Sequence, residues 1–249
     1  MASPPRADRS ALSWLARLLA STTLAIVLVQ VTTATATMSA RFDFSPLTDA
    51  QATQRLQRST VEVESLGCDL ALRQGSAVVI GPGEALTNEH VAGSSRSVDV
   101  SVPGMPLIPS VAVAVSPVAD VAVLSAEALS TDALALAPYD PIPGERVHLA
   151  GFPHETVRSA LPDGLVVDAA QVVDYVDGAP MGQPGQVMRL NVAASPGMSG
   201  GPVLDEAGRL AGLVFAVQSP TGDTLAVPVS VLRQLLNWHD PVQAGPCVG

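Results

Sequence analysis

Short runs of valine and other apolar residues recur along the chain, and turns rich in glycine and proline separate them. Runs of about five residues are typical of strands, because helices in globular proteins are longer. The runs are VEVESL, SAVVI, VDVSV, VAVAV, VAVLS, RVHLAG, LVVDAAQVVDYV, QVMRLNV, RLAGLVFAV and LAVPV. Turn signals lie at 81–84, 103–106 and 139–145. This pattern predicts an all-β fold of antiparallel barrels or sandwiches and argues against a parallel α/β sheet.

Only two segments outside the N-terminal region have a helical pattern. Residues 41–59 form a polar lead-in, and within it Thr48 is a candidate N-cap for a predicted helix. A second helix is predicted at 229–238, near the end of the chain. The turn at 139–145 contains two prolines and lies near the middle of the strand region, so we interpret it as the link between two β-modules.

The N-terminal segment 1–40 has the pattern of a signal peptide or a membrane anchor. Arginines precede an uncharged apolar run at 18–31, and small residues follow it up to Ala36. The run is shorter than the about 20 residues that a transmembrane helix needs. Cleavage is therefore favoured, and a membrane tether through 18–40 is the alternative. Both interpretations place residues 41–249 outside the cytoplasm, in the cell envelope or secreted, because the arginines stay inside.

Charge and composition exclude two classes of protein. The net charge is −10, from 13 basic and 23 acidic residues, whereas a nucleic-acid binder needs a basic face to neutralise phosphates. Hydrophobic residues make up 47% of the chain, which is too many for a mostly disordered protein.

The chain contains two cysteines, Cys68 and Cys247. An even number of cysteines in an exported protein predicts a disulfide between them, and two buried thiols are the alternative. The sequence has neither a cluster of metal ligands nor an HExxH motif, so we expect no metal.

Three segments carry residues suited to nucleophilic catalysis. A strand leads into His90, Asp120 directly precedes an apolar strand, and Ser199 lies in a tight glycine turn, GMSGG. A serine hydroxyl needs a base to take its proton, and histidine titrates near neutral pH. A buried carboxylate then fixes the histidine tautomer. We therefore predict His90 as base, Asp120 as its partner and Ser199 as nucleophile, with the N–H groups of Gly197 and Ser199 forming the oxyanion hole.

These segments resemble the trypsin-like serine proteases of the chymotrypsin fold, in particular the bacterial HtrA-like branch. The matching pieces are GSAVVI, LTNEHVAG, ADVAVL, GERVHLAGFP, GMSGGPVL, GRLAGLVFAV and LAVPVSVL, and they extend over about 60–238. The resemblance implies an endopeptidase that cleaves protein or peptide substrates through an acyl-enzyme, without a cofactor.

The resemblance also implies an architecture of two six-stranded antiparallel β-barrels with the active site between them. A C-terminal helix would pack on the first barrel and bring Cys247 toward Cys68. About 11 residues follow that helix, so no PDZ domain is expected. The implied division is a protease domain at 60–240, with barrels at about 60–138 and 145–228 and the helix at 229–238, and a tail at 241–249.

In this fold the residues before the nucleophile and a nearby strand line the pocket for the substrate residue that precedes the scissile bond. The corresponding positions are Ala193, Ala194, Val214, Phe215 and Ala216, and none of them is acidic. A basic substrate side chain would stay unpaired there, so the pocket predicts a preference for small or medium apolar residues.

Two alternatives use the same residues differently. A catalytically silent protease fold would serve as a binding module. The GxSxG pattern also matches the nucleophile elbow of α/β-hydrolases, which would use Asp223 and His239. That fold requires a helix directly after Ser199, and the sequence has Gly-Gly-Pro and a strand pattern there. The remaining histidines, His148 and His154, are interpreted as structural.

Overall fold

The computed structural model describes residues 45–154, 161–178, 185–218, 220–237 and 247. The predicted signal peptide or anchor at 1–40 lies outside them. Within the described ranges, no helix has both the length and the apolar content needed to cross a bilayer.

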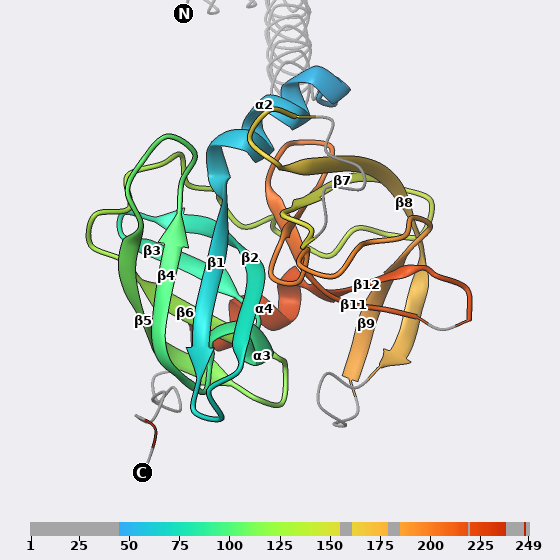
Figure 1. Cartoon of the computed structure of the whole chain (residues 1–249). Helices are drawn as coiled ribbons and strands as arrows, with labels where there is room; N and C mark the ends of the chain where they lie inside the picture. The colour runs from blue at the N-terminus through green and yellow to red at the C-terminus, as the bar shows by residue number, and fades with distance from the viewer. Residues whose placement is uncertain (1–44, 155–160, 179–184, 219, 238–246, 248–249) are drawn as a thin grey trace, which may run out of the picture. The chain divides into compact units, whose positions relative to one another are not determined.

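The first half of the domain is a closed antiparallel barrel of six strands, with the neighbour order β1-β2-β3-β6-β5-β4 (Figure 1). Strand β1 shows the alternation that is typical of a strand with one face in the core. Its residues Val61 and Val63 are buried, and Glu64, which follows Val63, is exposed. The short helix α3 (Glu89–Ala92) follows β3. The strands are β1 (Thr60–Gly67), β2 (Leu72–Gly81), β3 (Glu84–Thr87), β4 (Ser95–Ser101), β5 (Ile108–Ser116) and β6 (Val121–Ser125).

The second half repeats this architecture with the order β10-β11-β12-β9-β8-β7. The strands are β7 (Arg146–Gly151), β8 (Val166–Gly178), β9 (Gly185–Leu190), β10 (Pro202–Leu204), β11 (Leu210–Val217) and β12 (Thr224–Pro228). The predicted all-β fold of two six-stranded barrels is therefore confirmed.

A shared apolar cluster holds the two barrels together. It contains buried side chains of both barrels and of the two longer helices, α2 (Asp49–Ser59) and α4 (Val229–Leu236). Its buried members are Leu56, Val78, Leu86, Val121, Leu134, Ala150, Phe152, Leu165, Leu204, Leu210, Leu213, Val227 and Leu232. Because one core joins the barrels, residues from both can be held in fixed positions at their junction.

Helix α2 is bound to the second barrel by an ion cluster. Thr48 caps its N-terminus in a capping box with Gln51. Asp49 binds Arg146 Nη2 at 2.7 Å and the buried His148 Nε2 at 2.9 Å, both on β7. The hydrogen bond from His148 and the charge of Arg146 hold the pKa of Asp49 below its usual value. The structural role predicted for His148 thus has a specific partner.

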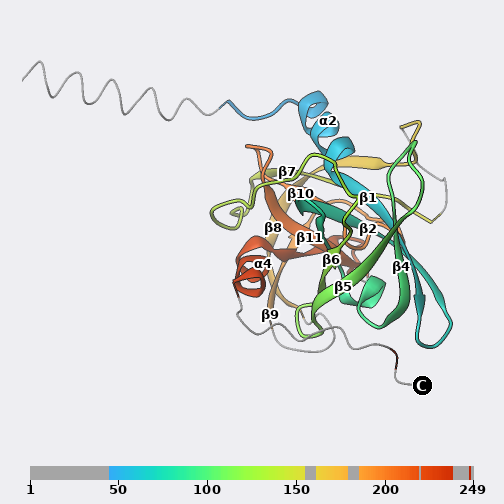
Figure 2. The same cartoon turned by 90° about the vertical axis from the view of Figure 1, so that its left-hand side faces the viewer.

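Helix α4 lies beside β11 and β12 (Figure 1), and Figure 2 shows it next to β11 from the side. The resemblance predicted packing on the first barrel. Leu232 of α4 belongs to the shared apolar cluster that also contains Val121 of β6, so the helix packs against side chains of both barrels. On the side of the first barrel, Val231 and Leu235 line a cavity of about 710 Å³ together with Val115–Ala119.

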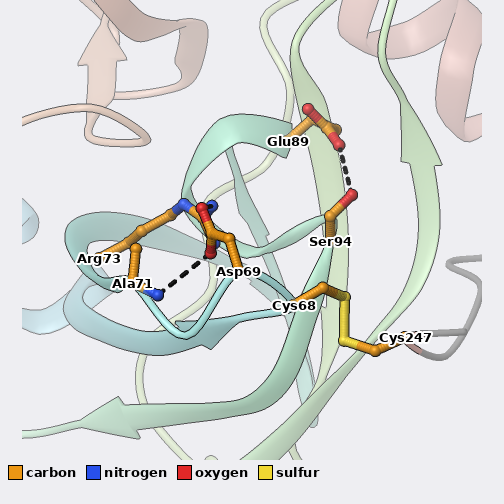
Figure 3. Close-up of a disulfide and its surroundings, with 7 residues drawn as sticks. All are labelled: Cys68, Asp69, Ala71, Arg73, Glu89, Ser94 and Cys247. Carbon is orange, nitrogen blue, oxygen red and sulfur yellow. Dashed lines mark hydrogen bonds and ion pairs between the residues drawn. A yellow bond between two sulfur atoms is a disulfide. The ribbon is translucent and has the colours of Figure 1, made fainter. Parts of the chain in front are cut away.

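The two cysteines form a disulfide between Cys68, just after β1, and Cys247 (Figure 3). Their Cα atoms are 5.4 Å apart and they are separated by 179 positions in the sequence. In the chain-entropy model, closing a loop of this size contributes up to about 5 kcal/mol to the free energy of unfolding. Beside the bond, Asp69 accepts hydrogen bonds from the Ala71 N–H and from Arg73, which stabilise the β1–β2 turn.

Candidate active site

His90 and Asp120 form a two-point contact at the edge of the first barrel. His90 Nδ1 lies 2.7 Å from Asp120 Oδ2, and the His90 backbone N–H donates to Oδ1 at 3.0 Å. The Asp120 side chain is 4% exposed and that of His90 is 39% exposed. With Nδ1–H donating to the carboxylate, Nε2 keeps its lone pair and is free to accept a proton.

The backbone of Asp120 is held in a strained conformation. Its φ is 52°, in the left-handed region that residues other than glycine rarely adopt. The buried Asn88 donates from Nδ2 to the Asp120 carbonyl at 2.8 Å, so the residue is fixed through both its backbone and its carboxylate. Strain of this kind persists where the surroundings determine the geometry, and it clusters at functional sites.

The turn that carries Ser199 is tied to the core of the second barrel. The Met198 N–H donates to the Ser195 carbonyl and the Gly201 N–H donates to the Met198 carbonyl, both at 3.0 Å. The Met198 side chain is 1% exposed and packs in the barrel core. Met198 therefore anchors the turn through its side chain as well as through its backbone.

Only glycine fits directly after Ser199. Gly200 has a φ of +85°, and a Cβ atom there would lie 2.0 Å from the Ser76 carbonyl oxygen and 2.5 Å from Thr87 Oγ1. Both atoms belong to the first barrel, so the turn that carries Ser199 packs directly against β2 and the end of β3.

Gly75 of β2 lies close both to the Ser199 backbone and to Val91, the residue after His90. A Cβ atom at Gly75 would be 3.0 Å from the Ser199 carbonyl oxygen and 2.7 Å from the side chain of Val91, which follows His90. The described residues include no hydrogen bond from Ser199 Oγ to His90. Such bonds are often long when no substrate is bound. His90 thus contacts Asp120 directly, whereas the Ser199 carbonyl group and the side chain of Val91 both lie close to Gly75.

Two backbone donors in the turn are free. Among the described residues, the N–H groups of Gly197 and Ser199 have no hydrogen-bond acceptor, although Gly197 is buried. Unpaired N–H groups at buried residues are rare in folded proteins. A pair of free donors beside a nucleophile is what stabilisation of a tetrahedral oxyanion requires.

The five predicted pocket residues differ in exposure. Ala193 is exposed, and Ala194, Phe215 and Ala216 are half-buried. Val214 is only 2% exposed because its side chain belongs to the core of the second barrel. Its backbone instead pairs with Gly200 and Gly201. Of the five predicted pocket residues, three alanines and a phenylalanine therefore have solvent-accessible side chains.

Thr224 fixes the backbone beside two of the predicted pocket residues, Ala193 and Ala194. Its Oγ1 donates to the Val192 carbonyl at 2.6 Å and accepts from the Ala194 N–H at 2.9 Å. Sequence analysis did not identify Thr224, because a single threonine at the start of a strand gives no signal of its own.

The arrangement does not fit the α/β-hydrolase alternative. Strand β10, not a helix, follows the Ser199 turn. Asp223 pairs with Arg189 at 3.0 Å, and His239 lies outside the described residues. Across the described ranges, no three histidine, cysteine or acidic side chains gather closely enough to hold a metal ion.

Comparison with known proteins gives a consistent picture. Residues 75–213 match the family model of the trypsin-like peptidase domain. Serine protease Rv3671c of Mycobacterium tuberculosis is 30% identical over 200 residues, covering 76% of this chain and 49% of that protein. The mitochondrial serine protease HTRA2 of Bos taurus is 30% identical over 175 residues, covering 69% of this chain and 37% of that protein. The chain thus spans about half the length, or less, of these curated relatives.

Solved structures show the same fold. The active form of the Rv3671c protease has a TM-score of 0.67 at 24% identity, covering 83% of this chain and 94% of that chain. The HtrA-type protease AlgW with a tripeptide has a TM-score of 0.65 at 23% identity, covering 76% of this chain and 62% of that chain.

Proposed function

Because the chain belongs to the trypsin-like peptidase family, we propose that it is a serine endopeptidase that cleaves peptide bonds through an acyl-enzyme. The observation that carries the proposal is the His90–Asp120 contact beside a Ser199 turn with two free N–H donors. The relatives named serine proteases support it, as does the AlgW structure with a tripeptide.

In the first half of the proposed reaction, Ser199 Oγ attacks the carbonyl carbon of the scissile bond while His90 Nε2 takes the hydroxyl proton. Asp120 stabilises the imidazolium that forms. The oxyanion accepts hydrogen bonds from the N–H groups of Gly197 and Ser199. The C–N bond then breaks as His90 donates its proton to the leaving amine, and an ester on Ser199 remains.

In the second half, a water molecule attacks the ester carbonyl and His90 takes its proton. The second tetrahedral intermediate uses the same two N–H donors. It collapses when His90 returns the proton to Ser199 Oγ, which releases the carboxylic acid product and restores the enzyme. No cofactor takes part in either half.

We also propose that the domain acts outside the cytoplasm. The Cys68–Cys247 disulfide supports this location, because such bonds persist in oxidising compartments. The arginines ahead of the apolar run at 18–31 support export of the residues that follow. Whether the leader is removed or tethers the protein decides between a secreted and a membrane-bound enzyme.

A fluorophosphonate probe tests the reaction class. We expect the wild-type protein to react at Ser199 and the Ser199→Ala variant to stay unlabelled, because only a serine activated by a base attacks phosphorus at a useful rate. Ser97→Ala removes an exposed serine on β4 and should label like wild type. Equal labelling of wild type and Ser199→Ala would overturn the enzyme assignment and favour a silent binding module.

Peptide-library profiling tests the proposed pocket. We expect cleavage after small or medium apolar residues, with kcat/KM at least about 100-fold lower after Arg or Lys, because a buried cation would have no partner. The variant Ala193→Asp places a carboxylate at the exposed position and should raise cleavage after Arg and Lys relative to wild type. A wild-type profile dominated by basic residues would refute the apolar pocket.

A further inference from the structure

We propose that Ser76 of the first barrel is a positioning residue that fixes the oxyanion hole in the second barrel. The proposal rests on the proposed function and adds a residue to it. Ser76 lies in β2, inside the apolar run SAVVI, and is 0% exposed. A buried hydroxyl in such a run requires hydrogen-bond partners, and these lie in the other barrel.

The hydroxyl, the backbone N–H and the carbonyl of Ser76 all form hydrogen bonds to residues outside β2. Its hydroxyl donates to the Gly197 carbonyl at 2.9 Å and accepts from the Phe152 N–H at 2.8 Å. Its backbone N–H donates to the Ser199 carbonyl at 2.7 Å, and its carbonyl accepts from Thr87 Oγ1 at 2.7 Å. Ser76 therefore holds two carbonyl groups of the nucleophile turn at once.

Holding a carbonyl also sets the direction of an N–H group. In a trans peptide the C=O and the N–H of one unit point in opposite directions. The Pro196 carbonyl accepts from the His154 N–H at 2.9 Å, so the Gly197 N–H of the same peptide points away from His154. The Gly197 carbonyl is held by Ser76, so the next N–H, on Met198, is also fixed.

The second free donor is set in the same way. The Met198 carbonyl accepts from the Gly201 N–H at 3.0 Å, which directs the Ser199 N–H of the same peptide to the opposite side. The Ser199 carbonyl is held by the Ser76 N–H. Four successive carbonyls, from Pro196 to Ser199, are thus occupied, and the two donors proposed for the oxyanion remain free.

The Ser76 hydroxyl is needed because the backbone conformation of Gly197 is not fixed by its own residue type. Gly197 has a φ of 97°, and glycine permits other backbone conformations at little cost. Without the hydroxyl, the Gly197 carbonyl and the Phe152 N–H would lose their shared partner. The Gly197–Met198 peptide lies between the two peptides that carry the oxyanion donors, and it would then be held only by the bond from the Met198 N–H to Ser195. The two donor N–H groups would therefore be less firmly held relative to each other.

His154 contributes from the opposite side of the same contact. Its ring Nε2 lies 3.0 Å from the Gln74 carbonyl oxygen, two residues before Ser76 on β2. A Cβ atom at Gly197 would lie 2.5 Å from His154 Cδ2. The segment after β7 and the strand β2 therefore hold the turn between them, which is a closer involvement than the structural role predicted for His154.

Steady-state kinetics of Ser76→Ala tests the proposal, with kcat divided by the concentration of active sites titrated with the fluorophosphonate. We expect kcat to fall about 100-fold with KM nearly unchanged, because misplaced oxyanion donors weaken the transition state more than the bound substrate. Affinity for a peptide boronic acid, which forms a tetrahedral adduct with the nucleophile, should fall by a similar factor. Ser110→Ala removes a buried hydroxyl of the same barrel that bonds to the Val98 carbonyl, and it should keep the wild-type kcat.

A second variant keeps the test decisive if Ser76→Ala does not fold. Ser76→Cys fills a similar volume with a weaker donor, so its kcat should lie between those of alanine and serine. An unchanged kcat per titrated site in either Ser76 variant, with wild type active, would overturn the positioning role and leave the proposed function intact. An inactive and unlabelled wild-type protein would instead overturn the proposed function itself.

Discussion

Replacing Ser199 by alanine is expected to lower kcat about a million-fold and to change the free energy of unfolding by less than about 0.5 kcal/mol. The kinetic loss follows from removal of the attacking oxygen, after which the remaining groups act only by binding and by oxyanion stabilisation. The stability is preserved because the turn is held through the Ser199 backbone and its neighbours, and the described residues provide no partner for Oγ. Hydrolysis of an activated peptide ester measures the first effect and urea denaturation the second.

Catalysis and stability are measured independently, so loss of the nucleophile can be distinguished from loss of the fold. If Ser199→Ala retained more than about 1% of the wild-type kcat, Ser199 would not be the nucleophile. If activity and stability were lost together, the variant would be unfolded. Wild type and Ser97→Ala, prepared and measured in the same way, are the controls, and both should be active and show the same free energy of unfolding.

The variant Asp120→Asn is expected to lower kcat about ten-thousand-fold at neutral pH. In the wild type both carboxylate oxygens accept hydrogen bonds from His90, one from the ring and one from the backbone N–H. An amide can accept only through its single oxygen. With the oxygen on the backbone N–H, the amide N–H₂ faces Nδ1, which must then accept, so Nε2 carries the proton and cannot receive one from Ser199.

Asp99→Asn is the matched control for this substitution. Asp99 lies on β4 of the same barrel, opposite Glu64 of β1, and has no hydrogen bond to His90 among the described residues, so its amide variant should keep kcat within about twofold. A kcat of Asp120→Asn within tenfold of wild type would contradict the role of Asp120. The ratio of the two variants is more informative than either alone, because both remove one negative charge from the same barrel.

The sequence predicted individual strands better than their pairing. Short apolar runs identified β1 and β2, whereas β3 and β10 have only four and three residues, too few to give a clear signal. Closure of each barrel depends on pairs such as β1 with β4, which local patterns do not contain. The two-barrel architecture was therefore predicted from the family resemblance and not from periodicity.

At the site, sequence motifs identified the residues proposed to take part in the reaction itself, and they missed the residues that position them. His90, Asp120 and Ser199 were named because their types and order fit one reaction. Ser76 was not, because its hydroxyl partners lie 76 and 121 positions away in the sequence.

The direction of the Val214 side chain could not be predicted from the sequence, because the strand is irregular at this position. The register between β11 and β12 shifts between Val214 and Ala216, which is the signature of a bulge. A bulge inserts a residue and changes which side chains point inward. The family resemblance assigned Val214 to the substrate pocket by its position in the fold, whereas its side chain packs in the core of the second barrel.

The disulfide has a topological consequence for a protease exposed to its own activity. Because Cys68 is bonded to Cys247, all the strands from β2 to β12 belong to one covalent ring. A single nick in any loop of that ring opens it without releasing a fragment, so the two barrels stay attached as one molecule. A cut outside the ring, before Cys68 or after Cys247, or two cuts within the ring are needed to separate a piece of the chain covalently.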